Sequence, residues 1–305
     1  LKPASISALT ALALGQLAHE AGLPAGVLQV IPGPGKEIGE ALAQHALIRK
    51  ISFTGSTESG ARIMALAAPE IKRVSLELGG KSPNIVFADA DLSKAASQSP
   101  LSVFANTGQD CCARSRVFVE ASIYDTFVEQ FLEATRTLKV GDPLSDETQL
   151  GPMVSAAQRS SVESYIESAR TEGRTLACGG DRPHAKGYYL NPTVILETET
   201  NDRCWKEEIF GPVVCIRRFH DEEDMLREVN DTPYGLSGSI WTQHLAKAIR
   251  VARRVESGVL SINTHASVHV EAPFGGYKQS GIGRDLGMHA LDGYSEIKNI
   301  FIAED

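Results

Sequence analysis

The stretch IRKISFTGSTESGARIMALAAPEIKRVSL, which occupies residues 48–76, decides the fold class of this chain. Residues 48–53 are typical of a strand, residues 57–67 have the apolar spacing of a helix, and residues 73–76 return to a strand pattern. Strand, helix and strand in this order form the unit of a parallel sheet covered by helices. The sequence therefore predicts an α/β fold.

The same rhythm continues on both sides of this stretch. Further helices are predicted at residues 6–21, 37–45, 92–106, 123–138, 155–172, 221–230 and 245–256. Further strands are predicted at residues 27–31, 84–87, 116–119, 213–219, 237–241, 259–262 and, at the end of the chain, 294–302. We expect two α/β units that meet near Gly79 and Gly80, and we expect Gly22 to cap the first helix.

Composition narrows the classes of function. With 42% hydrophobic and 22% charged residues, the chain has the balance of a soluble globular protein. Its net charge is −8 with acids and bases interspersed, which argues against nucleic acid or an anionic membrane as a partner. No apolar run approaches the roughly 18 residues of a membrane span, and no secretory signal opens the chain. Because Leu1 leads directly into a helical pattern, we expect the chain to be part of a larger protein.

Cysteine usage bears on the compartment. The five cysteines are Cys111, Cys112, Cys178, Cys204 and Cys215. An odd count without short regular spacing does not suggest a disulfide framework. The sequence contains no Cys-x-x-Cys, and no histidines are spaced to complete a zinc site. We therefore expect no metal and a reducing, cytoplasmic location.

Two stretches contain the residue types for acyl chemistry. Cys111 lies in FANTGQDCCA, residues 104–113, and Glu77 lies in LELGGK, residues 76–81. A thiol nucleophile and a carboxylate base are the groups needed to form a thioester and then hydrolyse it. A single cysteine is more often a small buried hydrophobe, and a single glutamate at a strand end more often faces solvent. The two glycines after Glu77, however, indicate the tight backbone path of a site.

A third stretch, FTGSTESG at residues 53–60, follows a predicted strand and opens a predicted helix. A helix start exposes N–H groups that suit a phosphate, Gly55 would let the backbone approach it, and Ser56 could donate its hydroxyl. An ordinary helix capped by serine explains these residues equally well. Residues 33–39 miss the spacing Gly-x-Gly-x-x-Gly, since the last gap is one residue too long.

Together these stretches resemble the NAD(P)-dependent aldehyde dehydrogenases. The resemblance extends to GQDCCARSR at residues 108–116, EEIFGPV at residues 207–213 and PFGGYKQSGIGR at residues 273–284, and it covers essentially the whole chain in order. It implies a Rossmann-type parallel sheet that is incomplete here, an α/β catalytic domain and a C-terminal oligomerisation strand. The implied domains are residues 1–79 for NAD(P) binding, 80–285 for catalysis and 286–305 for a return segment with that strand.

The resemblance implies oxidation of an aldehyde to a carboxylic acid. Cys111 would add to the aldehyde as a thiohemiacetal, hydride would pass to NAD or NADP, and Glu77 would assist hydrolysis of the thioester. Family members that transfer the acyl group to coenzyme A lack this glutamate, so its presence favours hydrolysis. The aldehyde stays open among aliphatic, aromatic and amino aldehydes.

The resemblance also implies cofactor contacts. Lys2 would contact the adenosine ribose, Glu208 would hold the nicotinamide-side ribose, and Phe210 would pack against the nicotinamide ring. Ser5 stands where many NAD-preferring members have a glutamate, so we expect NADP to be tolerated. The full set of implied cofactor residues is Lys2, Ser5, Gly55, Ser56, Leu78, Gly79, Gln158, Glu208 and Phe210.

On the substrate side, we expect Phe274 to face the aldehyde, with a core aromatic as the alternative. Cys112 is expected to line the pocket, and a redox role for the two adjacent thiols is a less favoured alternative. Asp110 could raise the pKa of the thiol by like-charge repulsion. Arg114 stands where many family members have glycine, and no role follows for it.

Three residues near the pocket complete these expectations. Asn263 is expected to organise the pocket wall. The resemblance implies that the loop at residues 265–271 lies where the family varies and sets substrate choice. His265 and His269 could reach the substrate there, but we expect both to face solvent.

The resemblance also bears on assembly and completeness. We expect residues 297–302 to pair with a partner subunit in a homodimer or homotetramer of the intact protein. An asparagine that serves the family as oxyanion donor lies outside this chain, so we expect the chain alone to be nearly inactive and prone to aggregation. The alternatives are a cofactor-independent thiol esterase and a structural protein on the same fold. Production of NADH from an aldehyde distinguishes an aldehyde dehydrogenase from a thiol esterase.

Overall fold

The computed structural model describes residues 1–303. These residues form two compact units that divide between Ser75 and Leu76, and each unit is described by itself. The functional domain boundaries expected at residues 79/80 and 285/286 stay predictions. Residues 304 and 305, the end of the expected return segment, lie outside the described residues.

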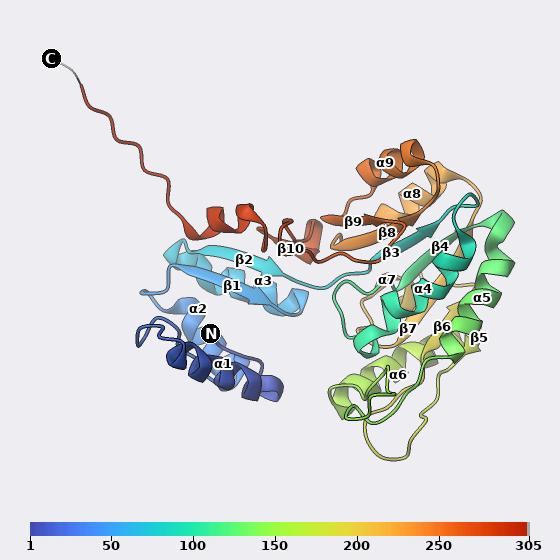
Figure 1. The fold of residues 1–305 in the computed structure, drawn as a ribbon, viewed down its shortest axis with the longest axis horizontal. Coiled ribbons are helices and arrows are strands. Elements are labelled where there is room, and N and C mark those ends of the chain that lie inside the picture. The colour runs from blue at the N-terminus through green and yellow to red at the C-terminus, as the bar shows by residue number, and fades with distance from the viewer. Residues whose placement is uncertain (304–305) are drawn as a thin grey trace. The chain divides into compact units, whose positions relative to one another are not determined.

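The first unit contains most of the strand–helix–strand element that is predicted over residues 48–76. Its elements in order are the 3₁₀ turn Ser5–Ser7, α1 (Ala8–Glu20), the π-helical turn Gly35–Gly39, α2 (Glu40–Gln44), β1 (Lys50–Thr54), α3 (Thr57–Ala67), the 3₁₀ turn Ala68–Glu70 and β2 (Arg73–Glu77), which continues into the second unit. The bounds of α3 agree with the predicted helix, and β1 and β2 are neighbours in a sheet, as predicted. Figure 1 shows these elements in blue.

Two local predictions in the first unit have opposite outcomes. Gly22 caps α1 with φ +89°, and the N–H of Leu23 donates to Ala18 O at 3.0 Å, so the predicted cap is confirmed. The strand predicted at residues 27–31 is wrong, because the structure assigns none there. This stretch makes two backbone hydrogen bonds to Leu1, and a pair of bonds is too short to form a ladder.

A seven-stranded sheet forms the centre of the second unit, in the order β5-β6-β7-β4-β3-β8-β9. The strands are β3 (Pro83–Val86), β4 (Arg116–Glu120), β5 (Thr175–Cys178), β6 (Thr193–Leu196), β7 (Val213–Phe219), β8 (Ser237–Trp241) and β9 (Val259–Ile262). Every neighbouring pair is parallel except β5 and β6 at one edge. The predicted parallel sheet is confirmed, and β5 and β6 were not expected.

Helices cover both faces of this sheet. The helices α4 (Leu92–Phe104) and α5 (Tyr124–Arg136) pack on one face, whereas α6 (Ala156–Thr171), α8 (Glu222–Asn230) and α9 (Leu245–Arg254) pack on the other (Figure 1). Successive strand side chains point to opposite faces, so Phe118 joins one core and its neighbours Val117 and Val119 join the other. A short helix, α7 (Arg203–Lys206), precedes β7.

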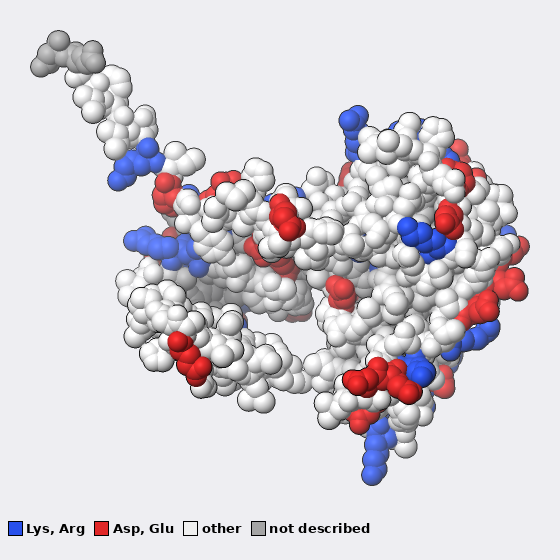
Figure 2. Space-filling view, in the orientation of Figure 1, with Lys and Arg blue, Asp and Glu red and all other residues white. Residues whose placement is uncertain are grey.

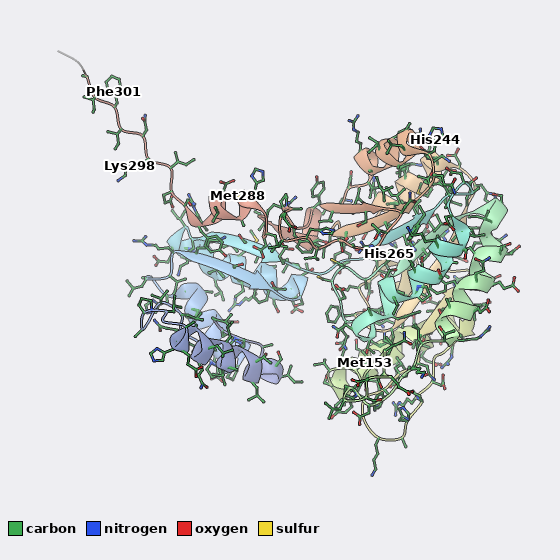
Figure 3. The ribbon with its side chains drawn as sticks, in the orientation of Figure 1. Met153, His244, His265, Met288, Lys298 and Phe301 are labelled. Atoms are coloured by element: carbon green, nitrogen blue, oxygen red, sulfur yellow. The ribbon has the colours of Figure 1, made fainter. Side chains whose placement is uncertain are left out.

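The C-terminal part of the second unit contains one correct and one incorrect expectation. A short strand, β10 (Gly281–Ile282), pairs antiparallel with Leu76 and Glu77. The 3₁₀ helix Met288–Tyr294 follows, and the strand predicted at residues 294–302 is wrong for this chain, because residues 295–303 have no strand assignment. The side chains of Ile297 and Phe301 are exposed, and Figure 3 labels Phe301 on this segment. Pairing with a partner subunit stays a prediction.

The surface contains charges of both signs. Figure 2 shows Lys and Arg side chains interspersed with Asp and Glu side chains on the face that it presents. Among residues 1–303, no helix has both the length and the apolar character needed to span a bilayer.

Candidate active site

Cys111 lies in a loop that begins with an abrupt turn after α4. Asn106, Thr107 and Gly108 follow each other with φ of 52°, 57° and 69°, all in the left-handed region. At Gly108 a Cβ would lie 2.1 Å from the carbonyl oxygen of Gly211, so only glycine fits there. The turn carries the chain away from the helix and presents Cys111 in a half-buried position.

The residues before the nucleophile are fixed by side-chain contacts. Gln109 Oε1 accepts a hydrogen bond from the N–H of Val154 at 3.0 Å. Asp110 Oδ1 accepts one from the N–H of Cys112 at 2.8 Å, bridging across Cys111. The motif Gly-Gln-Asp-Cys therefore holds Cys111 in a loop with both flanks fixed.

Glu77 ends β2 in a buried and sterically tight place. Glu77 is 7% exposed. Its Oε1 lies 2.8 Å from the position that a Cβ on Gly275 would occupy, and its Oε2 has no hydrogen-bond partner. Burial raises the pKa of this carboxyl to about 8, with Asp285 acting in the same direction and Arg284 opposing. Glu77 therefore binds a proton at neutral pH and becomes a base as the pH rises.

Gly79 and Gly80 bring the other two groups to the same turn. A Cβ on Gly79 would lie 2.1 Å from Glu208 Oε2, and a Cβ on Gly80 would lie 2.5 Å from the carbonyl oxygen of Cys111. The N–H of Gly80 also donates to Glu208 Oε1 at 3.0 Å. The expected tight backbone path is thus a place where Glu208 and Cys111 approach the residues that directly follow Glu77.

Gln158 and Phe210 meet on another segment of the second unit. The side-chain amide of Gln158 donates to the carbonyl oxygens of Phe210 at 2.9 Å and Ile209 at 3.3 Å. Phe210 has φ 53° and its residue is 39% exposed. Gln158 therefore stabilises a strained backbone that leaves an aromatic side chain accessible two residues after Glu208.

The thiols of Cys111 and Cys112 share a hydrogen bond. This bond lowers the pKa of Cys112 and raises that of Cys111, because one proton between two sulfurs is more favourable than none. Burial and the Asp110 carboxylate raise the pKa of both thiols, so the direction expected for Asp110 is confirmed. The two sulfurs and an Asp110 oxygen lie within 4.8 Å of one another, close enough to bind a metal ion. The expectation of no metal stays untested.

Phe274 and Leu78 are the two expected site residues that neighbour Glu77 or the residue in contact with it. Phe274 exchanges two backbone hydrogen bonds with Asp285, at 2.7 and 2.8 Å, and immediately precedes the Gly275 that contacts Glu77. Leu78 is buried, and its N–H donates to Ser280 O at 2.9 Å. Phe274 is thus next in the chain to the residue that approaches the Glu77 carboxylate, and the expected contacts of Phe274 and Leu78 with small molecules stay predictions.

The remaining expected cofactor residues belong to the first unit. Ser56 is the N-cap of α3, with its Oγ accepting from the N–H of Ser59 at 3.2 Å, and a Cβ on Gly55 would lie 2.5 Å from the Phe53 ring. The hydroxyl of Ser5 donates to Gly33 O at 3.0 Å. Lys2 Nζ donates to Pro3 O at 2.6 Å. The capped-helix interpretation describes Ser56, and phosphate binding at this helix start stays a prediction.

The position of His265 differs from the sequence-based prediction. His265 does not face solvent as expected: its ring packs 5.0 Å from the Trp241 ring, and its Nδ1 lies 3.0 Å from Ser239 Oγ. Burial, and then the nearby Arg114, lowers the pKa of His265 to about 3, so the ring is neutral. His269 is exposed, as expected. The histidine alone gave no signal of burial, because its neighbours come from distant parts of the chain.

Asn263 and Arg114 are also more engaged than the sequence shows. The Asn263 side chain makes two hydrogen bonds to the backbone of Thr242, accepting at 3.0 Å and donating at 2.9 Å, and its φ is 55°. Arg114 is 2% exposed and lies three residues after Cys111. The one sequence signal for Arg114 was a bulky cation where related chains have glycine.

Residues 1–300 match the model of the aldehyde dehydrogenase family. The chain belongs to this family. It is 45% identical over 305 residues to a betaine aldehyde dehydrogenase of Brucella anthropi, covering 99% of this chain and 62% of that relative. It is 45% identical over 303 residues to an aldehyde dehydrogenase of Enchytraeus buchholzi, covering 99% of this chain and 61% of the relative.

Solved aldehyde dehydrogenases have the same fold. The NAD⁺ complex of an aldehyde dehydrogenase from Bacillus cereus matches with a TM-score of 0.97 and 44% identity, covering 99% of this chain and 62% of that one. A betaine aldehyde dehydrogenase from Staphylococcus aureus, also in complex with NAD⁺, matches with a TM-score of 0.93 and 39% identity over 96% of this chain and 59% of that one. The chain thus spans about 60% of the length of these relatives.

Proposed function

We propose that this chain contains the catalytic centre of an enzyme that oxidises an aldehyde to a carboxylic acid with NAD or NADP. The observation that carries the proposal is the turn after Glu77. At Gly79 and Gly80 it brings together the backbone of Cys111 and the carboxylate of Glu208. A nucleophile, a base and a carboxylate able to bind a ribose therefore lie at one place. The relatives in Brucella and Bacillus, which are aldehyde dehydrogenases, support the same activity.

The residues of the second unit fit a nicotinamide nucleotide. Glu208 is half-buried, which raises the pKa of its carboxyl, and the N–H of Gly80 fixes one of its oxygens. A carboxylate held in this way can accept hydrogen bonds from ribose hydroxyls. Phe210 offers an accessible aromatic face for the ring. When bound, the nicotinamide would supply the acceptor for hydride.

The first unit, taken by itself, has groups that suit the phosphates of a nucleotide. The start of α3 after Gly55 has backbone N–H groups that suit a phosphate. Ser5 has no carboxylate to repel a 2′-phosphate, and its hydroxyl already donates to Gly33. We therefore propose that NADP is accepted beside NAD. NADP binding that is far weaker than NAD binding in steady-state assays would contradict this part.

The chain's own groups define two chemical steps. The sulfur of Cys111, once ionised, adds to the aldehyde carbon and forms a C–S bond, and the carbonyl oxygen takes the negative charge. Departure of hydride from that carbon leaves a thioester on Cys111. Glu77, once it has lost its proton, takes a proton from a water that attacks the thioester carbon, and the thiolate leaves. Since the pKa of Glu77 is about 8, the second step accelerates as the pH rises through that value.

Assembly and compartment are proposals of the same kind. We propose that residues 297–302 pair with a second subunit, because their apolar side chains are exposed in the single chain. Light scattering on the intact protein should then show a dimer or tetramer. We also propose a reducing cytoplasm, which fits five free thiols.

The activity is tested on this chain alone and on a joined protein. The joined protein is this chain fused to the part of the Brucella anthropi relative that lies outside the alignment, since the chain spans 62% of that relative. We expect the joined protein to produce NADH from a panel of aldehydes, and we expect the chain alone to produce little. Ester hydrolysis without any NADH production would favour the thiol esterase instead.

A further inference from the structure

Arg114 is a buried cation without an assigned role. A buried guanidinium is costly unless its N–H groups find acceptors. Its Nε donates to Ser239 Oγ at 2.9 Å, its Nη1 donates to the carbonyl oxygen of Cys112, and its Nη2 donates to the carbonyl oxygens of Gly238 and His265, both at 3.4 Å. All four acceptors are neutral oxygens, so these bonds leave the positive charge of Arg114 uncompensated.

These acceptors come from three separate segments. Cys112 belongs to residues 109–115 before β4, which we call the nucleophile loop. Gly238 and Ser239 belong to β8, and His265 lies in the loop after β9. A planar guanidinium presents five N–H donors in a fixed fork, which suits simultaneous bonds to several segments. Arg114 therefore fastens the nucleophile loop to the strand and to the loop that the sequence associates with substrate choice.

Further hydrogen bonds connect Arg114 through Ser239 to His265, and the loop of His265 in turn bonds to the Cys112 thiol. The Ser239 hydroxyl accepts from Arg114 Nε at 2.9 Å and lies within hydrogen-bond distance of His265 Nδ1, at 3.0 Å, so it links the two side chains. Figure 3 labels His265, whose ring packs on Trp241. Two residues after His265, the Ser267 side chain hydrogen-bonds to Cys112 and helps to lower the pKa of that thiol.

The charges facing the thiol pair are mostly negative. Asp110 raises the pKa of both thiols and Glu208 raises that of Cys111, whereas Glu77, which faces the Cys112 thiol, gains its negative charge only as the pH rises through about 8. Arg114 is the cation that lowers the pKa of Cys112, beside the stronger effect of the hydrogen bond from Cys111. A fixed positive charge close to a thiol favours its anionic form.

We propose that Arg114 is a positioning residue that fastens the nucleophile loop to β8 and to the loop at residues 263–267, and that keeps a positive charge beside the Cys111–Cys112 pair. The proposal rests on the proposed function where it treats Cys111 as the nucleophile. Arg114 is satisfied by protein acceptors and does not itself touch the substrate.

The test measures alkylation of Cys111 by iodoacetamide across roughly pH 6 to 10, located by peptide mass spectrometry, in the 305-residue chain. For Arg114→Met we expect the midpoint of the pH profile to rise by about one unit, and alkylation near neutral pH to slow roughly tenfold. Arg114→Lys should keep a midpoint close to that of the parent, because it keeps the charge. Hydrogen exchange at residues 263–267 should accelerate in both variants, because neither Met nor Lys can reproduce the fork.

The control is Arg116→Lys. Arg116 is 1% exposed and donates to the carbonyl oxygens of Lys81, Glu228 and Val229, so it shares no acceptor with Arg114. We expect this variant to lower the melting temperature and leave the alkylation midpoint unchanged. An equal rise of the midpoint in Arg116→Lys and Arg114→Met would overturn the proposal, since the effect would then report general loosening.

Unchanged alkylation and unchanged exchange in a folded Arg114→Met variant would also overturn the proposal. If Arg114→Met does not fold, Arg114→Lys decides: faster exchange at residues 263–267 with a parental midpoint supports the proposal, and parental exchange contradicts it. Alkylation and exchange need no cofactor or aldehyde. A joined protein that failed to oxidise aldehydes would therefore contradict the proposed function while leaving this test intact.

Discussion

The surroundings of Cys111 and of Glu77 differ in how they hold a reactive group. The nucleophile loop is held by polar contacts, with Asp110 bonding across Cys111 and Arg114 bonding to Cys112. Glu77 is held by close packing against Gly275, and one of its oxygens has no partner. The hydrogen bond shared with Cys112, burial and the nearby carboxylates raise the pKa of Cys111, and burial raises the pKa of Glu77 to about 8. Both reactive groups therefore bind their protons at neutral pH, and they differ in how their positions are held.

The largest effect should follow from removing the nucleophile. Cys111→Ala in the joined protein should lower aldehyde oxidation by at least about 1000-fold, because no covalent intermediate can form. NADH production under saturating aldehyde is the measurement. Cys178→Ala is the matched control, since this thiol lies on the edge strand β5 and should leave the rate unchanged. Oxidation retained in Cys111→Ala would show that Cys111 is not the nucleophile.

Removing the base should affect only the second step. Glu77→Gln should slow thioester hydrolysis by about 100- to 10,000-fold, the usual range for a lost general base. Hydride transfer should persist, so stopped-flow traces should show a burst of NADH followed by a very slow steady rate. A variant that lost the burst as well would indicate that Glu77 acts before hydrolysis and would break the division between the two regions.

The turn that joins the two regions should tolerate no side chain. Gly80→Ala places a Cβ 2.5 Å from the Cys111 carbonyl oxygen, so the nucleophile loop must shift. We expect a loss of about 1–3 kcal/mol in the free energy of unfolding and roughly 100-fold lower activity. At Gly151 the nearest atom to a Cβ is 3.6 Å away, so Gly151→Ala is the control that should change little. Equal activity of the two variants would contradict a close approach at Gly80.

The remaining expected effect is on stability as a function of pH. The pKa of Glu77 is raised to about 8 in the folded chain, well above the ordinary glutamate value of 4.5. Between these values the folded state binds the extra proton, so this carboxyl should make the protein less stable as the pH rises from about 4.5 to about 8. Denaturant titrations should show a shallower decline for Glu77→Gln. An identical slope in both proteins would mean that Glu77 is not buried as described.

Much of the fold could be predicted, because its signals are local. The helix over Thr57–Ala67 and the strands Val213–Phe219 and Val259–Ile262 have the predicted bounds. The strand expected at residues 27–31 does not form, since an apolar run becomes a strand only beside a partner that pairs with it. Periodicity along one segment contains no information on that partner.

The candidate site divides in the same way. Gly79 and Gly80 signalled a tight path in the sequence, because the need for glycine shows at the position itself. The role of Arg114 could not be predicted, since its acceptors Ser239 and His265 lie 125 and 151 residues further along the chain. His265 was misplaced for the same reason, as its burial depends on Trp241. Long-range packing decided both.

The most direct test of this division between nucleophile and base traps the thioester on Cys111. The Glu77→Gln form of the joined protein is incubated with an aldehyde and NAD, quenched in acid and analysed by intact mass and peptide mass spectrometry. We expect one acyl group per chain, located on Cys111, with one NADH formed for each. An acyl group on another residue, or NADH formed continuously without an acyl group on Cys111, would contradict it.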